Sequence, residues 1–454
     1  MSIPVAESNQ QLEQPTKQPG LGYAWYVVIV LMVCYTLSFI DRQILSLLVA
    51  PIKRDLGISD TKIGLLQGLA FAVFYTLLGF PLGRIADRYS RRNLIAVGVF
   101  FWSLMTALCS VALSFWSLAT ARMGVGVGEA TLGPSAFSMI SDYFPKERLG
   151  GALSVYAMGI FIGSGLALIV GGTVVGKVSE LPAVDLPLIG TIASWRLTFL
   201  IVGLPGLLIG LLVYTVREPL RQNLMRQTDG RVSQLHLREV LAQLARRWRS
   251  VVGVSLGLSS QAMCNYAMLA WAPTYFLRVH GWKPRDTGLV LGVMTLTVGC
   301  VGMYFGGKLC DRWQQRRISE APLKVGVIAT TTVGVLFTLM TVLPNLTWIL
   351  VLLTCSQFFL AMPVGSSYAA LQFIFPNQLR GQVSALLLFT INIGGLMLGP
   401  LLPGLFNDYL FRDENMVGAS LALTIIMASV TAATLFRTTY RPYRAHYAMM
   451  HEAS

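Results

Sequence analysis

Four ionisable side chains lie inside stretches of the sequence that are otherwise apolar enough to span a membrane. They are Asp41 and Arg42 in one stretch, and Arg122 and Glu129 in another. Insertion scales assign a cost of about 2.5–3.5 kcal/mol to one such charge at the centre of a membrane helix. These groups must therefore face one another or a hydrated cavity rather than lipid.

The spacing of these residues suggests how they work together. Arg122 and Glu129 are separated by two helical turns and so share one helix face. Asp41 and Arg42 are neighbours and point about 100° apart. Two acids and two bases at similar depth can exchange partners when a proton arrives, so Asp41 and Glu129 are candidate proton-coupling residues. The alternative is a static ion network that fixes the helix register.

The composition indicates that lipid surrounds most of the chain. Charged residues make up 12% of the 454 residues, apolar residues make up 54%, and the mean hydropathy is +0.62. A soluble fold of this size would expose large apolar patches. Stretches of about 20 apolar residues are long enough to cross a bilayer. The sequence predicts twelve spans, at about 23–49, 61–80, 94–113, 117–140, 150–175, 195–216, 250–278, 286–308, 323–343, 346–371, 381–403 and 417–440.

A short motif occurs twice, about half a chain apart. Gly83-Arg-Ile-Ala-Asp87-Arg88 recurs as Gly307-Lys-Leu-Cys-Asp311-Arg312, and each copy lies between two apolar stretches. Internal duplication of a membrane bundle is typical of secondary transporters. We therefore predict an all-α membrane protein with two pseudo-symmetric six-helix bundles.

The predicted spans also define the domain organisation. The polar interval between the sixth and seventh spans contains leucines at helical spacing with arginines between them, which predicts an amphipathic helix at the membrane surface. The expected order is a disordered tail (1–22), an N-terminal bundle (23–216), a linker with the amphipathic helix (217–249), a C-terminal bundle (250–440) and a second tail (441–454).

The net charge of +14 is explained by membrane orientation. Most Lys and Arg residues fall on one side if both termini are cytoplasmic, as the positive-inside rule requires. This predicts a multi-pass protein of the plasma or inner membrane with both termini and the linker in the cytoplasm. No nucleic-acid partner is expected, because no basic stripe carries aromatic stacking residues.

The second half has no buried charges that match those of the first. Its spans carry neutral polar residues instead, and we select Asn265, Tyr368 and Asn392 as candidate substrate-binding residues together with Arg42 and Arg122. Hydrogen bonding between helices is the alternative role for each neutral residue. A charged half that faces an apolar half suits an amphipathic ligand.

Catalysis and metal binding are not expected. The six cysteines have no metal-ligand spacing, and the four histidines lie in predicted loops or in the tail. A membrane enzyme would need a nucleophile–base pair or a metal cluster within the spans. We therefore expect no enzyme activity and no cofactor.

The duplicated motif resembles the loop motif of the major facilitator superfamily, although Ser90 stands where that family usually has glycine. The resemblance covers essentially the whole chain and implies a gating role for Asp87. In the outward-open state it would cap the eleventh helix and pair with a cation at the end of the fourth, for which Arg148 is the candidate. The resemblance extends this gating set to Arg88, Arg91, Asp311 and Arg312.

A narrower resemblance is to the spinster branch, which transports sphingolipids and lysolipids. It rests on Ser38-Phe39-Ile40-Asp41-Arg42 and on Arg122-x-Gly-x-Gly-x-Gly-Glu129-Ala130. The resemblance implies that Asp41 and Glu129 are proton-linked. It also implies that Arg42 and Arg122 bind the anionic head of the ligand or the two carboxylates.

The leading hypothesis is a monomeric, proton-linked carrier of an amphipathic organic anion, of the sphingolipid or lysophospholipid type, that works by alternating access. Two other transport functions of the same fold remain open. One is a drug/proton antiporter, and the other is a symporter of small organic anions. A compact polar cavity with several arginines would favour the small anion, whereas a long cavity open to lipid would favour the lipid-like substrate.

Overall fold

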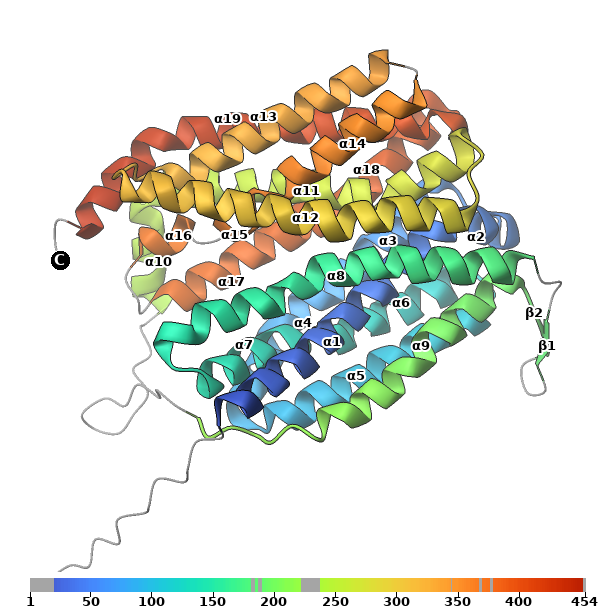
Figure 1. Cartoon of the computed structure of the whole chain (residues 1–454), viewed down its shortest axis with the longest axis horizontal. Helices are drawn as coiled ribbons and strands as arrows, with labels where there is room; N and C mark the ends of the chain where they lie inside the picture. Colours follow the sequence, from blue (N-terminus) through green and yellow to red (C-terminus); the bar gives the residue numbers. More distant parts are fainter. Residues whose placement is uncertain are drawn as a thin grey trace, which may run out of the picture.

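The computed structural model describes residues 20–180, 184–186, 190–221, 237–343, 345–366, 370–375 and 379–451. Nearly all of these residues are helical, and most helices run along one long axis (Figure 1). Tyr368, most of the first predicted tail and part of the predicted linker lie outside the described residues.

The N-terminal half consists of helices and one small hairpin. Strands β1 (Val184–Leu186) and β2 (Gly190–Ile192) are antiparallel, and Val184 pairs with Ile192. The helices are α1 (Leu21–Leu47), α2 (Val49–Leu56), α3 (Asp60–Gln67), α4 (Leu69–Arg88), α5 (Arg91–Leu108), η1 (Cys109–Val111), α6 (Phe115–Glu129), α7 (Leu132–Tyr143), α8 (Lys146–Ser179) and α9 (Ser194–Val213).

The C-terminal half is entirely helical in its described residues and includes two π-helical segments, η3 and η4. Its elements are α10 (Leu237–Arg246), α11 (Trp248–Val279), α12 (Pro284–Gln315), α13 (Ala321–Val342), α14 (Leu346–Ala361), α15 (Pro363–Ser366), α16 (Ala370–Phe373), α17 (Arg380–Ile391), η3 (Asn392–Met397), α18 (Leu398–Leu405), η4 (Phe406–Phe411), η5 (Glu414–Met416) and α19 (Val417–His451).

Helices occupy all twelve of the predicted spans. Nine helical segments in the described part of the chain are individually long and apolar enough to cross a membrane. The other three predicted spans differ for local reasons: one is divided between α6 and α7, one ends early with α14, and α11 carries several polar residues. The predicted all-α membrane fold is confirmed, with the addition of one short hairpin.

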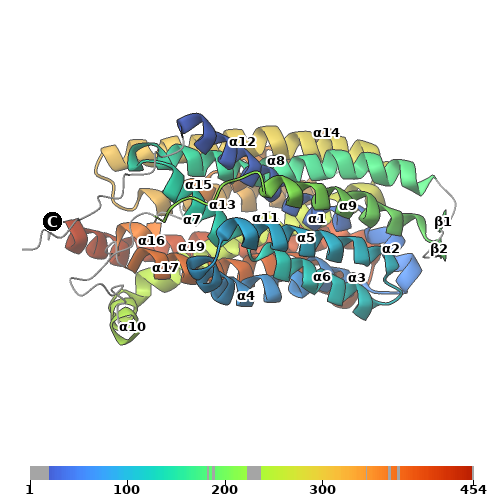
Figure 2. The same ribbon diagram turned by 90° about the horizontal axis from the view of Figure 1, so that it is seen from below.

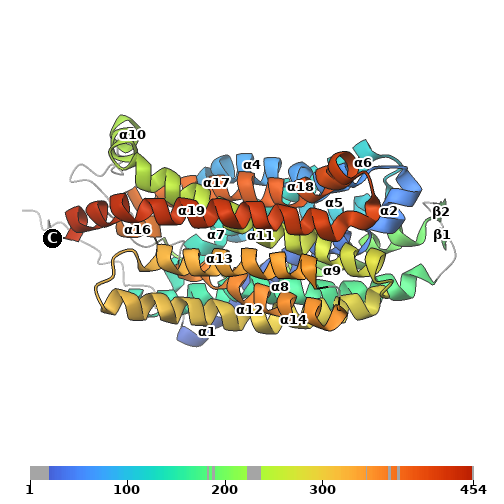
Figure 3. The same ribbon diagram turned by 90° about the horizontal axis from the view of Figure 1, so that it is seen from above.

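The two ends of the bundle differ in what they carry. Helix α1 begins and α19 ends at the same end, which we name the termini end, and β1 and β2 mark the opposite, hairpin end (Figure 1). Helix α19 continues to His451, so the described part of the second predicted tail is helical. Helix α10 lies crosswise at the termini end and projects beyond the bundle (Figures 2 and 3).

The halves approach one another most closely where α8 meets α12. A Cβ atom added to Gly288 would lie 2.2 Å from the carbonyl oxygen of Leu168, and one added to Gly172 would lie 2.5 Å from that of Pro284. Any larger side chain at these two positions would push the helices apart. The glycines therefore fix the contact between the halves.

Candidate functional site

Helix α6 places two of the four charged residues beside α4 and α5. Ser114 caps its first turn through a reciprocal bond with Ser117. A Cβ atom on Gly126 would lie 2.6 Å from the carbonyl oxygen of Phe71, and one on Gly128 would lie 2.7 Å from Trp102. The glycine series of α6 therefore allows close helix packing.

Arg42 and Glu129 form a buried ion pair between α1 and α6. Arg42 Nε donates to Glu129 Oε2 at 2.6 Å, and a second guanidinium nitrogen also contacts this oxygen. The rings of Phe39, Phe71 and Tyr75 surround the guanidinium, with centroids 4.5–4.9 Å from its carbon. Such contacts stabilise a cation that has left water. The Glu129 side chain is fully buried, so removing either partner would leave a buried charge without its counter-ion.

Asp41 and Arg122 are also buried, but they do not form an ion pair. Arg122 Nη1 donates to the backbone carbonyl of Asp41 at 2.9 Å, and its Nε and Nη2 have no hydrogen-bond partner among the described residues. Neither carboxylate oxygen of Asp41 accepts a hydrogen bond there, although Thr106, Arg122 and Glu129 lie close enough to interact with it. The cluster thus contains a paired acid, Glu129, and an unpaired one, Asp41.

Two of the three predicted ligand residues of the C-terminal half are described, and neither forms a hydrogen bond with this cluster. Asn265 on α11 and Asn392 at the start of η3 are half-buried, and their side chains form no hydrogen bond with another described residue. Tyr368 lies outside the described residues. Both asparagines remain available for a ligand.

A small cavity does lie beside Arg42, where the two halves meet. It offers about 20 Å³ to the centres of water molecules, which is room for about one of them. Its lining is drawn from both halves and comprises Phe39, Arg42, Gln43, Ser46, Gln67, Phe71, Tyr266, Leu269, Ala270, Leu396 and Pro400. The charged cluster therefore reaches the interface between the halves through Arg42.

At the hairpin end a second buried charge cluster joins the halves. Asp60, at the start of α3, accepts from Lys53 at 2.6 Å and from Arg278 of α11 at 2.8 Å. Asn407 of η4 donates to the same carboxylate at 3.0 Å, and Asp408 accepts from the backbone N–H groups of Asp60 and Thr61. We name this set the hairpin-end latch.

Sequence reasoning missed the latch because its members lie at the boundaries of predicted spans. Asp60 precedes one predicted span and Arg278 is the last residue of another, and charges at such positions are typical of span ends that face solvent. The available signal was their opposite charge at the same predicted membrane depth.

The predicted gating residues at the termini end are not joined in this way. They are exposed and form no ion pair with another described residue; they comprise Asp87, Arg88, Arg148, Asp311 and Arg312. Arg91 differs from them, because it is buried and binds Asp142 of the N-terminal half and Glu218 at the start of the linker. The gating roles of these residues stay predictions.

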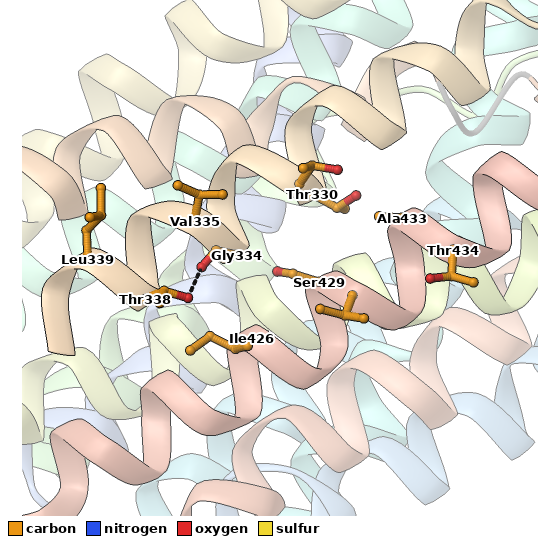
Figure 4. A pocket seen from close by; sticks show the side chains of 11 residues that line it. Thr330, Gly334, Val335, Thr338, Leu339, Ile426, Ser429, Ala433 and Thr434 are labelled. Carbon is orange, nitrogen blue, oxygen red and sulfur yellow. Dashed lines mark hydrogen bonds between the residues drawn. The ribbon is translucent and has the colours of Figure 1, made fainter. Parts of the chain in front are cut away.

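A larger groove lies away from these charges, between α13 and α19 (Figure 4). It offers about 400 Å³ and opens on the outer surface of the C-terminal half. The hydroxyl of Thr338 donates to the carbonyl of Gly334 on its own helix, at 2.8 Å, and is thereby satisfied. This groove contains no charged residue and does not belong to the candidate site.

Comparison with known proteins gives a family match over most of the chain. Residues 31–400 match the model of the Major Facilitator Superfamily. An MFS-type efflux pump from Mycolicibacterium smegmatis is 27% identical over 425 residues, which cover 90% of this chain and 91% of that protein. Protein spinster homolog 1 from Xenopus laevis is 27% identical over 353 residues, which cover 72% of this chain and 64% of that protein.

Two further similarities are to a curated transporter and to a solved structure. A probable L-galactonate transporter of Escherichia coli is 26% identical and covers 69% of this chain and 67% of its own length. A bacterial homologue of the human lysosomal transporter Spinster, solved in an inward-facing, unoccupied conformation, superposes with a TM-score of 0.74 at 24% identity. That alignment covers 96% of this chain and 99% of the other. The solved structure agrees with the fold, and the similarity to protein spinster homolog 1 agrees with the resemblance to the spinster branch.

Proposed function

Because this chain belongs to the Major Facilitator Superfamily, whose members are membrane transporters and not enzymes, we propose that it moves an amphipathic organic anion by proton-linked alternating access. The observation that carries this proposal is the buried cluster, in which one acid is paired and the other is not. Arg42 and Glu129 form an ion pair, whereas Asp41 lies unpaired against Arg122.

The geometry supports a role for this cluster in coupling. An unpaired carboxylate in the membrane interior is costly in its charged form, so Asp41 is the candidate carrier of a proton in this conformation. Substrate at Arg42 would compete with Glu129 for the guanidinium. Loss of that partner would favour proton uptake by Glu129 and so link substrate binding to proton movement.

The latch supports alternating access between two rocking halves. The hairpin end is held closed by Asp60 and its partners, while Asp87 and Arg148 at the termini end are apart. Rocking would break the first set and form the second. Because the positive-inside rule puts the basic termini end in the cytoplasm, we assign this arrangement to the inward-facing state.

The proposed substrate is lipid-like, of the sphingolipid or lysophospholipid type, with its head at Arg42 and Arg122. The similarity to spinster proteins supports this choice. A small organic anion is the second candidate, because the cavity beside Arg42 is compact and one relative is a probable L-galactonate transporter. The similarity to an MFS-type efflux pump supports drug/proton antiport as a third. We further propose that the protein acts as a monomer in the plasma or inner membrane.

Transport into proteoliposomes tests the function directly. Purified protein is reconstituted, a pH gradient is imposed in either direction, and uptake of a sphingoid-base phosphate is compared with uptake of a sugar acid. We expect the pH gradient to drive accumulation of the lipid phosphate. In Asp41→Asn and Glu129→Gln, this gradient-driven accumulation should be at least tenfold lower. Normal gradient dependence in both variants would contradict the proposed coupling.

A matched control separates coupling from general loss of charge. Asp286 is an exposed carboxylate in the first turn of α12 with no ion pair among the described residues. Asp286→Asn should accumulate substrate as the unmodified protein does. If only the sugar acid accumulated, the result would favour a small organic anion as the substrate over a lipid-like one.

A further inference from the structure

The cavity beside Arg42 contains a polar side chain that the folded protein does not use. Gln67 is more than nine-tenths buried and lines this cavity. Neither its Oε1 nor its Nε2 has a hydrogen-bond partner among the described residues. A glutamine amide offers two donor hydrogens and two acceptor positions, so leaving all of them unmade opposes folding.

A neighbouring glutamine shows what a structural role looks like in the same place. Gln43 is equally buried and lines the same cavity. Its Nε2 donates to the backbone carbonyl of Leu269 at 3.2 Å and so joins the two halves. Gln67 has no such contact, so helix association does not explain its presence.

A helix break holds Gln67 in position. Gln67 is the last residue of α3, and Gly68 separates α3 from α4. A Cβ atom on Gly68 would lie 2.6 Å from the carbonyl oxygen of Met397 in η3. The chain therefore passes tightly against the opposite half directly after Gln67, and the amide is fixed at the interface that must open during transport.

The chemistry of the unused groups restricts what they can bind. A carboxylate or phosphate oxygen only accepts hydrogen bonds and would leave Oε1 of Gln67 unsatisfied. A hydroxyl group both donates and accepts, and so can satisfy both ends of the amide. The Arg42 guanidinium in the wall of the same cavity suits an adjacent anionic group.

We propose that Gln67 is a specificity-determining residue that binds a hydroxyl group next to the anionic group of the substrate. The inference rests on the proposed transport of an organic anion and narrows its class to hydroxylated anions. A lysophospholipid or sphingoid phosphate with a free hydroxyl belongs to this class, and so does a sugar acid. Gln67 thus recognises the feature that the first two substrate candidates share.

The test compares each hydroxylated anion with its deoxy analogue. The probes are a lysophosphatidic acid and the same molecule without its free hydroxyl, together with a sugar acid and its 2-deoxy form. Equilibrium binding to purified protein and uptake into proteoliposomes are both measured. A site built to bind a hydroxyl rejects the analogue that lacks it, so we expect at least a tenfold preference, which Gln67→Leu reduces to about one.

Gln261 provides a matched control, since it is a buried glutamine outside the cavity that donates to the carbonyl of Leu360 at 2.9 Å. Gln261→Leu should keep the tenfold preference. The inference is overturned if Gln67→Leu retains the preference, if both variants lose it equally, or if no probe binds. A different outcome is that binding of the hydroxylated anion over its deoxy analogue depends on Gln67, but uptake does not follow the pH gradient. That result supports the inference and contradicts the proposed proton coupling instead.

Discussion

Both ends of the bundle carry charged residues, but the two ends use them differently. At the hairpin end, a fully buried carboxylate, Asp60, binds two cations, one from each half. At the termini end, Asp87 and Arg148 are exposed and form no ion pair with a described residue. The same kinds of side chain thus join the two halves at the hairpin end. At the termini end, the ion pairs of the described residues, such as Arg91 with Asp142, do not join them.

This difference shows where the free energy that holds the present conformation resides. Charges that are exposed and unpaired contribute little to the conformation in which they are unpaired. A buried, hydrogen-bonded cluster stabilises the conformation that contains it only while all of its members remain. The hairpin-end latch should therefore determine the equilibrium between the two access states.

The largest effect is expected from Asp60→Ala. The substitution leaves Lys53 and Arg278 without their shared carboxylate, and breaking a buried pair costs about 3–5 kcal/mol. The hairpin end should open in a large fraction of molecules. Spin labels at two exposed positions on opposite halves, Arg54→Cys and Tyr409→Cys, should report a longer distance at this end.

Two features of the chain make this measurement selective. Cys300 and Cys355 are the described cysteines that are not buried, and replacing them with alanine confines labelling to the introduced pair. Lys62→Ala removes an exposed cation at the same end that forms no ion pair with a described residue, and it should leave the distance unchanged. An unchanged distance in Asp60→Ala would show that the latch does not hold this end closed.

The second prediction contrasts the two buried acids at the centre. Glu129→Gln removes the charge that pairs with Arg42 and should lower thermal stability in detergent by about 2–3 kcal/mol, because an amide oxygen can still accept a hydrogen bond. Asp41→Asn should change stability by less than about 1 kcal/mol, since Asp41 has no ion pair to lose. Equal destabilisation by the two variants would contradict the difference in pairing.

A smaller effect is expected from Glu218, which anchors the start of the linker at the termini end. Its partial burial acts to raise its pKa, but hydrogen bonds from the N–H of Arg92, from Arg91 and from Ser90 outweigh that effect and hold the pKa below its ordinary value of 4.5. The stabilisation is therefore present at neutral pH and lost as the pH falls below 4.5. Glu218→Gln should cost about 1–2 kcal/mol at pH 7 and flatten this acid dependence in thermal unfolding.

The sequence predicted the helical architecture well because its signals are local. Apolar stretches of membrane-spanning length and a duplicated motif predicted the spans, and the confirmed fold follows from them. Clustering of Asp41, Arg42, Arg122 and Glu129 was also predictable, because a charge in lipid must find a partner. The sequence could not predict which acid pairs with which base, because the pairing depends on the rotation of α1 relative to α6.

The latch and the Gln67 cavity could not be predicted for a different reason. Both depend on contacts between residues more than 200 positions apart, such as Asp60 with Arg278. The sequence does not distinguish Gln67 from other polar residues within the spans. Only the structure shows that the side chain of Gln43 donates a hydrogen bond, whereas the side chain of Gln67 forms none among the described residues. Tertiary contacts, not residue types, distinguish these roles.

The smallest effect on the present conformation is expected from Asp87→Asn, although it changes a residue of the duplicated motif. Asp87 is exposed and unpaired among the described residues, so thermal stability should stay within about 0.5 kcal/mol. The same substitution should matter in the opposite state, where a carboxylate beside a helix N-terminus and a cation is favourable. In the background of Asp60→Ala it should shorten the spin-label distance again, because the state that Asp87 stabilises is then the populated one. If Asp87→Asn instead lowered stability on its own by more than 1 kcal/mol, the termini end would already be latched and the two ends would not differ as described.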